Sequence, residues 1–435
     1  MQHKPSVLLI AIDTMRADHL GVAGNDSIET PHLDALARDG VLFTRALAAA
    51  PWTLPSVASI FTGLLPYRHG AVGGDRTWLD GSHTTMAEHF LAAGYRTGGI
   101  AAVDWLTDAC NMDQGFQRWQ GELPPEDLSR AEAQTWLARA FCDWHRMRPF
   151  FLFLHYFDVH APYTPPAPFD GMYYLGDPYR DGEPVLSMLQ SPGNRAPNRD
   201  GEMYDFLAGV TDPAYPMQQY AAGVSYVDMH VGLVLARLKR LDLYDDMLIV
   251  LLADHGEHLG EHDIWFTHLL PYEETLRVPL IIKLPRSLHA GSVVDDPVSL
   301  LDVLPTVLAG AQLKTDLPLD GRNLLPVLAG REAGGSLLAA EQGSSDDRYS
   351  KSWQQGDWKL LFFREPDAAR YELYDLAADP RELNDLAAAQ PQIVARLRDG
   401  MWKLWDPARI VSEDGRGRPR KLDEATKRRL RSLGY

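Results

Sequence analysis

The chain has 435 residues, of which 45% are hydrophobic and 23% are charged, a composition typical of a globular protein with a large core. The formal net charge of −17 argues against nonspecific binding to nucleic acid or to anionic membranes. Because no apolar run approaches the length of a membrane-spanning helix, and the first run is too short for a secretory signal, we predict a cytoplasmic protein without nucleic-acid or membrane partners. Its two cysteines are expected to be unpaired thiols, with a single disulfide as the alternative.

The first third of the chain alternates between predicted strands and predicted helices. The apolar run at residues 7–12 indicates a strand that is buried on both faces. Apolar residues recur at helical spacing in 34–39 and 84–93, each segment ends at a glycine, and each is followed by a predicted strand, at 41–43 and 96–102. This alternation predicts an α/β fold with a mostly parallel sheet flanked by helices.

The middle of the chain continues the pattern and then interrupts it. A predicted helix at 125–148 leads into a second buried strand at 150–154, and a helix at 220–241 leads into a third at 247–252. Between them, residues 162–216 are rich in Pro, Gly, Asp and Tyr and lack periodicity. Loops of this length in a compact domain are often functional, so we predict a lid-like insertion there.

The C-terminal part has a different character from about residue 336. Strands are predicted at 358–363 and 371–374, followed by a helix at 392–402 that packs on them. We therefore predict a large domain at 1–335 and a small antiparallel α+β subdomain at 336–435. The end of the chain is basic, which indicates either a solvated tail or a contact between the subunits of a homo-oligomer.

Polar side chains follow each of the three buried strands. Asp13 follows the first strand, His155 follows the second, and Asp254 and His255 follow the third. In open α/β sheets, ligands bind beyond the carboxyl ends of such strands. Thr53 lies at a predicted helix start between the first two strands and is expected to cap that helix. These residue types predict a metal site with a hydroxyl nucleophile.

Taken in order, the motifs along the chain resemble those of the sulfatase family of the alkaline-phosphatase superfamily. The matching stretches are residues 12–21, 30–37, 53–63, 66–70, 155–163, 253–257, 272–279 and 372–380. The resemblance implies an alkaline-phosphatase-like sandwich with a small C-terminal antiparallel subdomain. It also implies a metal-dependent hydrolase that acts on phosphoric or sulfuric ester bonds of a small anionic substrate.

The resemblance also assigns roles to individual residues. Asp13, Asp254 and His255 match the metal ligands of the family, and Thr53 stands at the position of the nucleophile, which also contacts the metal. Carboxylates combined with an imidazole favour Mn²⁺ or Zn²⁺, with Ca²⁺ as the alternative. His160 matches a histidine that contacts the substrate near the leaving group.

Expectations also follow for the other histidines. His268 falls where many sulfatases have a lysine on the transferred group, so it is assigned as a catalytic residue. His155 is expected to be either structural or a partner of a metal ligand. His69 is expected to be structural, and His258 and His262 are expected to lie on a solvent-facing loop.

Two departures from the family pattern bear on the substrate. Typical sulfatases have Cys or Ser at the nucleophile, which is oxidised to formylglycine, and an arginine four residues later. This chain has Thr53 and Val57 instead, and it lacks the family's Lys-x-His pair in residues 101–108. Threonine does not readily become formylglycine, whereas a phosphorylated threonine can be opened by water at phosphorus. We therefore predict hydrolysis of phosphodiesters or phosphonate monoesters. The alternatives are an arylsulfatase, a transferase with an alcohol acceptor and a metal-binding relic without activity.

Overall fold

The structure is a computed structural model that describes residues 4–73, 78–101, 103, 105–120, 130–191, 202–331, 335–345 and 348–405. The strands of the main sheet are β1 (Val7–Ile12), β2 (Val41–Leu47), β3 (Arg96–Ile100), β4 (Arg118–Gln120), β5 (Phe150–Tyr156), β6 (Leu248–Ala253), β9 (Arg277–Lys283), β10 (Ser292–Val294) and β11 (Val298–Ser299). Their order across the sheet is β10-β2-β9-β6-β1-β5-β3-β4, with β11 also paired to β2.

The sheet is mostly parallel, as predicted. The central strand β1 pairs in parallel with β5 on one side and with β6 on the other. Only β9, among the described strands of this sheet, runs antiparallel to both of its neighbours, β2 and β6. All residues of β1 and β5 are buried, which explains why these strands are continuous apolar runs rather than alternating ones.

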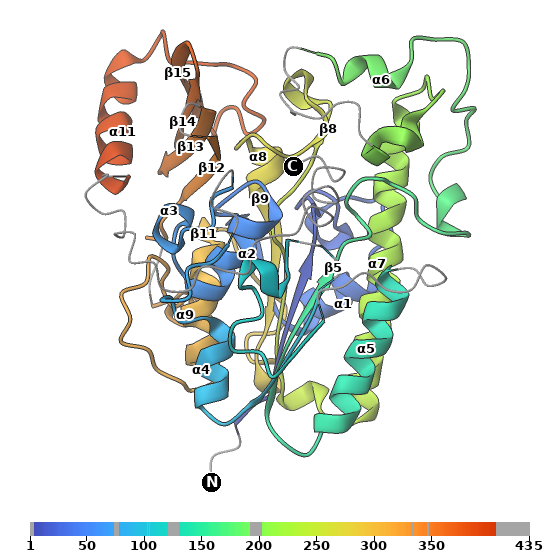
Figure 1. Cartoon of the computed structure of the whole chain (residues 1–435), viewed down its shortest axis with the longest axis vertical. Helices are drawn as coiled ribbons and strands as arrows, with labels where there is room; N and C mark the ends of the chain where they lie inside the picture. The colour runs from blue at the N-terminus through green and yellow to red at the C-terminus, as the bar shows by residue number, and fades with distance from the viewer. Residues whose placement is uncertain are drawn as a thin grey trace.

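Helices cover both faces of the main sheet (Figure 1). One face carries α1 (Pro31–Asp39), α5 (Arg130–His145) and α7 (Ala214–Arg240), and the other carries α2 (Thr53–Thr62), α4 (Met86–Ala92) and α9 (Val303–Gly310). The helix predicted at 220–241 begins earlier, at Ala214, and the start of the helix predicted at 125–148 lies outside the described residues. The helix predicted at 84–93 begins two residues later, at Met86, because Thr85 and Glu88 form a reciprocal capping box before it.

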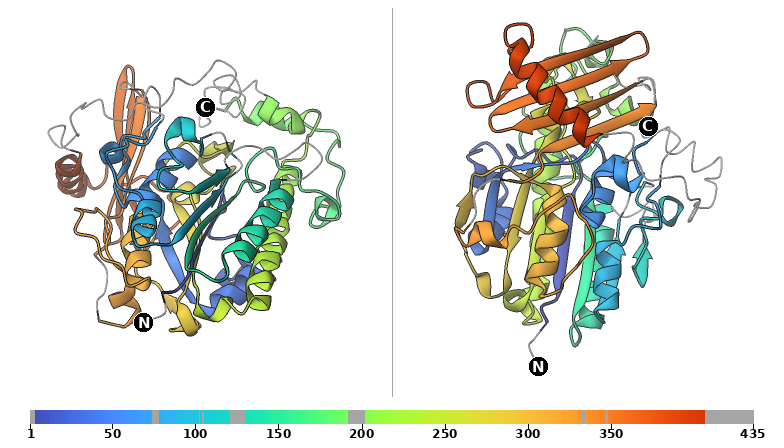
Figure 2. Two further views of the ribbon diagram at one scale, coloured as in Figure 1. Left: turned by 60° about the horizontal axis from the view of Figure 1, so that its bottom comes forward. Right: turned by 90° about the vertical axis from the view of Figure 1, so that its left-hand side faces the viewer.

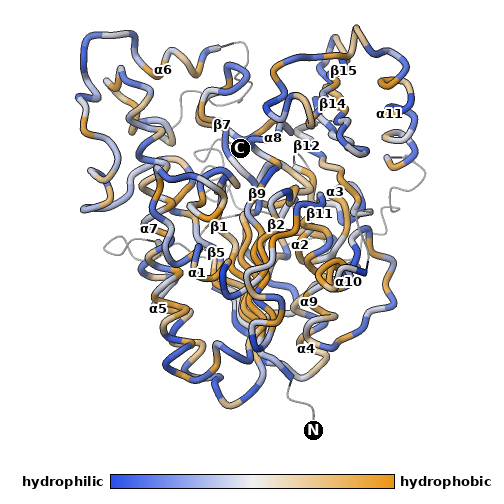
Figure 3. Tube along the Cα trace, turned by 180° about the vertical axis from the view of Figure 1, so that it is seen from behind, coloured by the Kyte–Doolittle hydropathy of each residue, from blue (hydrophilic) through white to orange (hydrophobic). Residues whose placement is uncertain are grey.

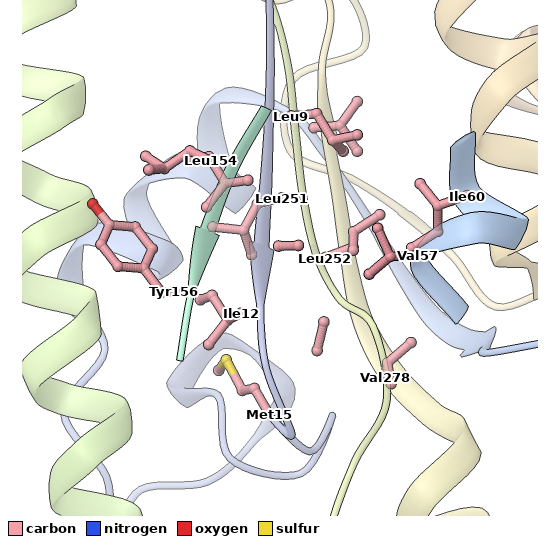
Figure 4. Close-up of a cluster of buried hydrophobic side chains, with 14 of the residues drawn as sticks. Leu9, Ile12, Met15, Val57, Ile60, Leu154, Tyr156, Leu251, Leu252 and Val278 are labelled. Carbon is pink, nitrogen blue, oxygen red and sulfur yellow. The ribbon is translucent and has the colours of Figure 1, made fainter. Parts of the chain in front are cut away.

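The core lies between the sheet and these helices. Hydrophobic residues concentrate along the central strands when the chain is coloured by hydropathy (Figure 3). On the α2 face, Val57 and Ile60 point toward Leu252 on β6 and Val278 on β9 (Figure 4). The apolar side of α2 thus fixes the position of the helix start at the carboxyl edge of the sheet.

A second, antiparallel sheet follows in the chain, as expected. It consists of β12 (Ala339–Ser345), β13 (Arg348–Gln355), β14 (Trp358–Glu365) and β15 (Ala368–Asp375), with α11 (Pro391–Leu404) packed on it (Figure 2). Side chains of β14 alternate between two buried clusters. Leu360 and Phe362 pack in the cluster that contains the α11 residue Leu397, whereas Leu361 and Phe363 pack in a cluster with Tyr272.

The segment between β5 and α7 lacks long elements in its described part. It contains η3 (Phe169–Gly171), α6 (Val185–Met188) and η4 (Glu202–Leu207). Figure 1 shows α6 and the second sheet at the same end of the molecule, opposite the N-terminus. Both lie toward the carboxyl ends of β1, β5 and β6, where a lid would have to lie. A lid function of this segment stays a prediction.

Three further expectations bear on the molecule as a whole. In the described parts of the chain, no helix combines the length and the apolar character needed to cross a membrane. Within the same residues Cys110 and Cys142 are buried, and no disulfide joins them. The basic tail and its role in a homo-oligomer fall on residues 406–435, which lie outside the described residues. The domain boundary at 335/336 stays a prediction.

Candidate active site

The register of the three central strands brings the predicted polar residues together. Ile12 on β1 is paired with Tyr156 on β5 and with Ala253 on β6, so Asp13 and Asp254 follow neighbouring strand ends. The Asp13 amide continues the ladder by donating to the Tyr156 carbonyl at 2.8 Å. Because parallel strands end at the same edge, residues about 240 positions apart in sequence become neighbours.

The side chains form one compact buried cluster. Asp13 Oδ1 lies 3.3 Å from His255 Nε2, and Asp254 Oδ2 lies 3.6 Å from the same nitrogen. Thr53 Oγ1 lies 3.3 Å from both Asp13 Oδ2 and His255 Nε2. All four residues have an exposed fraction of 0%. The structure therefore brings together the four residues that the sequence assigned to a metal.

Helix α2 presents Thr53 to this cluster, but not as its cap. Trp52 is the N-cap residue, no side chain caps the helix, and Thr53 is the first helical residue. The expectation that Thr53 caps the helix is therefore wrong, because its hydroxyl is turned toward Asp13 and His255 instead. The helix is fixed at this edge by Ser56, whose hydroxyl donates to the Asp254 carbonyl at 2.5 Å. The positive end of the α2 dipole thus lies at the cluster, where it favours an anion.

His155 is a further member of the cluster. Its Nε2 lies 3.4 Å from Asp13 Oδ2, and one ligand-type atom from each of Asp13, His155 and Asp254 lies within 4.8 Å of the others. The sequence left the role of His155 open between a structural residue and a ligand partner. One feature of the sequence favoured a place for His155 in the site: it is an imidazole in the otherwise apolar, fully buried strand β5, next to β1.

The cluster has the properties of a cation site. Buried atoms without a hydrogen-bond partner converge there, namely Asp13 Oδ1, Asp254 Oδ2 and His155 Nε2. Such atoms are costly in a protein interior unless an ion or another partner compensates them. Two carboxylates and two imidazoles are a donor set that suits a divalent transition metal. The residues present therefore fit the metal that the resemblance implies.

The pKa values of these groups reflect the same need for positive charge. Burial raises the pKa of Asp254 to about 6, and the neighbouring Asp13 carboxylate adds to this rise. Burial opposes the ionisation of Asp13, but hydrogen bonds with His155 and His255 hold its pKa well below the ordinary value. Burial disfavours the charged form of His255 as well, yet Asp254 and Asp13 raise its pKa to about 9. Two carboxylates in contact thus draw positive charge onto the imidazole between them.

His160 and His268 lie beside the cluster and beside each other. Their ring centroids are 5.2 Å apart, and the His268 ring lies 4.5 Å from that of His255. His160 Nδ1 lies 2.7 Å from the Ala161 carbonyl oxygen, which can only accept, so Nδ1 carries the hydrogen. Burial lowers the pKa of His160 to about 4, so the ring is neutral near pH 7 and its Nε2 is an acceptor.

Glu257 is a further buried residue of the site, and it was not among the predicted site residues. It is 1% exposed, Tyr163 donates its hydroxyl to Oε2 at 3.0 Å, and Oε1 lies 3.6 Å from His268 Nδ1. Burial raises its pKa to about 7. The sequence feature that could have identified Glu257 as a site residue is its position two residues after His255. Glu257 connects the segment after β6 with Tyr163, at the start of the predicted lid.

The remaining histidines differ in how well they match expectation. His69 is buried and accepts the Ala71 N–H at Nδ1, consistent with the structural role expected. The expectation that His258 and His262 lie on a solvent-facing loop is wrong, because His258 is fully buried and only 12% of the His262 side chain is exposed. The reason is that the Tyr272 ring covers His262, at a centroid distance of 4.0 Å.

The two departures from the family pattern have different structural outcomes. Val57 is fully buried and packs in the core beneath α2, so no cation replaces the absent arginine at that position (Figure 4). In the segment that lacks the Lys-x-His pair, Ala102 and Asp104 lie outside the described residues, whereas Val103 and Trp105 are buried.

Comparison with known proteins decides the family. The sulfatase family profile matches residues 5–313, and a profile described as N-sulphoglucosamine sulphohydrolase, C-terminal, matches residues 260–406. The chain belongs to the sulfatase family. Proteins of this family, within the alkaline-phosphatase-like superfamily, hydrolyse ester bonds and use a divalent metal ion. The resemblance seen in the sequence motifs is thereby confirmed.

Individual relatives span most of this sulfatase-family chain. An arylsulfatase of Clostridium perfringens is 26% identical over 443 residues, covering 88% of this chain and 90% of that protein. A choline-sulfatase of Rhizobium meliloti is 27% identical over 436 residues, covering 88% and 82%. The crystal structure of a phosphonate monoester hydrolase of Agrobacterium radiobacter superimposes with a TM-score of 0.75 at 23% identity, covering 94% of this chain and 96% of that one. This last likeness shows the fold.

Proposed function

We propose that this sulfatase-family protein is a metal-dependent hydrolase of phosphodiesters or phosphonate monoesters that uses Thr53 as its nucleophile. The observation that carries the proposal is the position of the Thr53 hydroxyl. It lies at the start of α2, fully buried, and 3.3 Å from both Asp13 and His255. A hydroxyl so placed faces a cation site and a helix N-terminus together, and both stabilise an alkoxide.

Asp13, Asp254, His255 and Thr53 would hold the metal, with Mn²⁺ or Zn²⁺ favoured by the imidazole. His155, at 3.4 Å from Asp13, completes the donor set. Such a metal, when bound, lowers the pKa of a coordinated hydroxyl and offsets charge on the transferred group.

The reaction then proceeds in two displacements at phosphorus. In the first, Thr53 Oγ forms a bond to phosphorus, the bond from phosphorus to the leaving alcohol breaks, Thr53 loses one proton and the leaving oxygen gains one. In the second, a water oxygen attacks the same phosphorus, the bond to Thr53 breaks, the water loses a proton and Thr53 regains one. The balance is one water consumed for each ester bond cleaved.

His160 is the group best suited to carry the proton. Its Nδ1–H is held by the Ala161 carbonyl, so the neutral ring accepts only at Nε2. It can therefore receive a proton and return it to the leaving oxygen, which is general acid–base catalysis by one side chain. His268, next to it, is placed to donate a hydrogen bond to a non-bridging oxygen.

The substrate class follows from the residues at positions 53 and 57. Formylglycine chemistry releases sulfate without attack at sulfur, but a threonine ester must be cleaved at its central atom. With Val57 in the core, one cationic contact to the transferred group is missing. That loss weakens binding of a dianionic monoester more than that of a monoanionic diester.

A substrate panel tests the proposal. We expect aryl phosphodiesters or aryl phosphonate monoesters to exceed aryl sulfates in kcat/KM by at least about tenfold, equal to about 1.4 kcal/mol of transition-state preference. The metal-loaded enzyme is assayed with matched leaving groups, and Thr53→Ala is assayed on each substrate as a control for contaminating activity. A clear preference for the aryl sulfate contradicts the proposed substrate class.

Sulfuric ester hydrolysis is the second candidate, and the relatives favour it. The arylsulfatase and the choline-sulfatase described above are both named as sulfatases. A transferase is the third, and it is distinguished in the same assay by added alcohol. Formation of a new ester with glycerol at the expense of hydrolysis indicates transfer rather than hydrolysis.

A further inference from the structure

A second group of buried ionisable side chains lies where the antiparallel sheet region meets the segment after β6. It shares no residue with the Asp13 cluster. His262 comes from η6 (Glu261–Asp263), Glu274 comes from α8 (Glu273–Leu276), and Glu382 follows β15. One ligand-type atom from each of the three lies within 4.8 Å of the others. They thus join three separate parts of the chain.

Glu274 has a buried oxygen that accepts no hydrogen bond in the described structure. Glu274 is 8% exposed, and its Oε2 is buried without a hydrogen-bond partner. The nearest ion-pair atom is His262 Nε2 at 3.6 Å, which is too long for a hydrogen bond. A buried carboxylate oxygen of this kind is strongly destabilising unless a cation compensates it.

The charges around the group do not balance. Four glutamates surround it: Glu273, Glu274, Glu372 and Glu382. The cations that face them are Lys359, which lies 2.9 Å from both Glu273 and Glu382, and Arg370, which lies 2.8 Å from Glu372. If all four glutamates are ionised, the two cations leave an excess of two negative charges. One divalent cation neutralises that excess; without it, protons on both His262 and Glu382 are needed, since burial raises the pKa of Glu382 to about 7 and, although burial opposes it, the glutamates raise the pKa of His262.

Neighbouring residues already orient two of the three side chains, His262 and Glu382. The His262 ring stacks on Tyr272 at an interplanar angle of 14°, and the Tyr272 hydroxyl donates to Glu372 at 2.8 Å. Glu382 Oε2 accepts the Glu273 N–H at 2.7 Å. Fixed ligand orientation of this kind is what supporting hydrogen bonds provide around metal sites.

We propose that His262, Glu274 and Glu382 form a second divalent-metal site that fastens the antiparallel sheet region to the catalytic sheet. Nitrogen and carboxylate ligands bind Zn²⁺ at about 2.0–2.2 Å in tetrahedral geometry, so two ligands of one ion lie roughly 3.4 Å apart. His262 Nε2 and Glu274 Oε2 already lie 3.6 Å apart, and a ligand-type atom of each of the three residues lies within 4.8 Å of the others. The imidazole selects Zn²⁺ or Mn²⁺ against Ca²⁺.

The metal content of the full chain tests this site. The protein is loaded with ZnCl₂, dialysed, and analysed for zinc per chain. We expect two equivalents in the native protein, one in Glu274→Gln, one in Asp254→Asn, and none in the double variant. Glu273→Gln is the matched control, because it removes a neighbouring carboxylate that is paired with Lys359 and should leave two equivalents. The Asp254→Asn arm reports on the active-site metal separately, so failure of one site is distinguishable from failure of the other.

A second variant and a second measurement protect the test against misfolding. His262→Gln removes a ligand at the partly exposed edge of the group and should also lose one equivalent. In the Asp254→Asn background, zinc should raise the melting temperature, and Glu274→Gln should abolish that rise. One equivalent in the native protein that persists in Glu274→Gln and His262→Gln would overturn the site and leave a protonated His262–Glu274 pair in its place.

Discussion

The Thr53 hydroxyl lies between a carboxylate and an imidazole, and the residue is fully buried. No side chain caps α2, so the hydroxyl is not needed for helix formation. Its two contacts at 3.3 Å, to Asp13 and His255, are instead contacts to residues of the cation site. A substitution that removes the Thr53 hydroxyl should therefore affect catalysis much more than stability.

Substitution of Thr53 tests its role as the nucleophile. Thr53→Ala should lower kcat at least about a thousandfold, because removal of a nucleophile removes the covalent route. Thr53→Ser keeps the hydroxyl and should stay within about tenfold of the native kcat. Urea unfolding of each variant checks that the fold persists. If Thr53→Ala turns over at the native rate, a water molecule rather than Thr53 attacks the substrate.

Some residues of the site could be predicted from the sequence and others could not. Asp13, Asp254 and His255 were predictable because each follows a buried strand, and such strand ends meet. His155 was left undecided, because it is the last but one residue of β5 and only the strand pairing shows that it faces Asp13. The second group of ionisable residues was not predicted, since His262, Glu274 and Glu382 carry no common pattern in sequence.

At the scale of elements, α2 is held to the short helix that follows it by His69. That helix is α3 (Pro66–His69). The Ala71 N–H donates to Nδ1 at 3.2 Å, so Nε2 carries the hydrogen and faces Ser59 Oγ of α2 at 3.0 Å. Burial lowers the pKa of His69 to about 3, and the nearby His83 lowers it further. The folded protein therefore keeps this ring neutral.

This neutral histidine predicts a pH dependence of stability. The unfolded chain binds a proton at His69 below about pH 6.5, whereas the folded protein does so only near pH 3. The stabilisation is thus fully present above pH 6.5 and is lost as the pH falls from 6.5 toward 3. One such proton contributes a slope of about 1.4 kcal/mol per pH unit to the free energy of unfolding.

His69→Asn keeps an acceptor for Ala71 and removes the titrating group. It should unfold more easily at pH 7 but lose less stability per pH unit between pH 6 and 4, measured by urea unfolding. Other buried histidines titrate in both proteins and cancel in the comparison. Equal slopes for the two proteins would show that His69 does not stay neutral in the folded state.

The elements themselves were largely predictable, for two physical reasons. Continuous apolar runs predicted the central strands and the strand β14 of the second sheet, and apolar residues at helical spacing predicted helices such as α7. The boundaries were less accurate, as in α7, which begins at Ala214. The prediction that Thr53 caps α2 was wrong because a capping rule considers only the local backbone. The Thr53 hydroxyl instead contacts Asp13 and His255, which are distant in sequence.

At the scale of the whole molecule, two sheets and one intervening segment meet at the carboxyl edge of the main sheet. The main sheet supplies Asp13, His155 and Asp254, and Tyr163 at the start of the predicted lid contacts Glu257. The antiparallel sheet region is joined to the same edge through Lys359 and Glu273. Catalysis and the attachment of the second sheet thus involve the same stretch of chain, from Asp254 to Leu276.

The stereochemical course at phosphorus tests the central claim, attack by Thr53, most directly. An aryl phosphorothioate diester of known configuration is hydrolysed by the metal-loaded enzyme in ¹⁸O-labelled water, and the configuration of the product is determined. Each in-line displacement inverts phosphorus, so two displacements through Thr53 give net retention. We predict retention; inversion would mean a single attack by water and would contradict a covalent Thr53 intermediate.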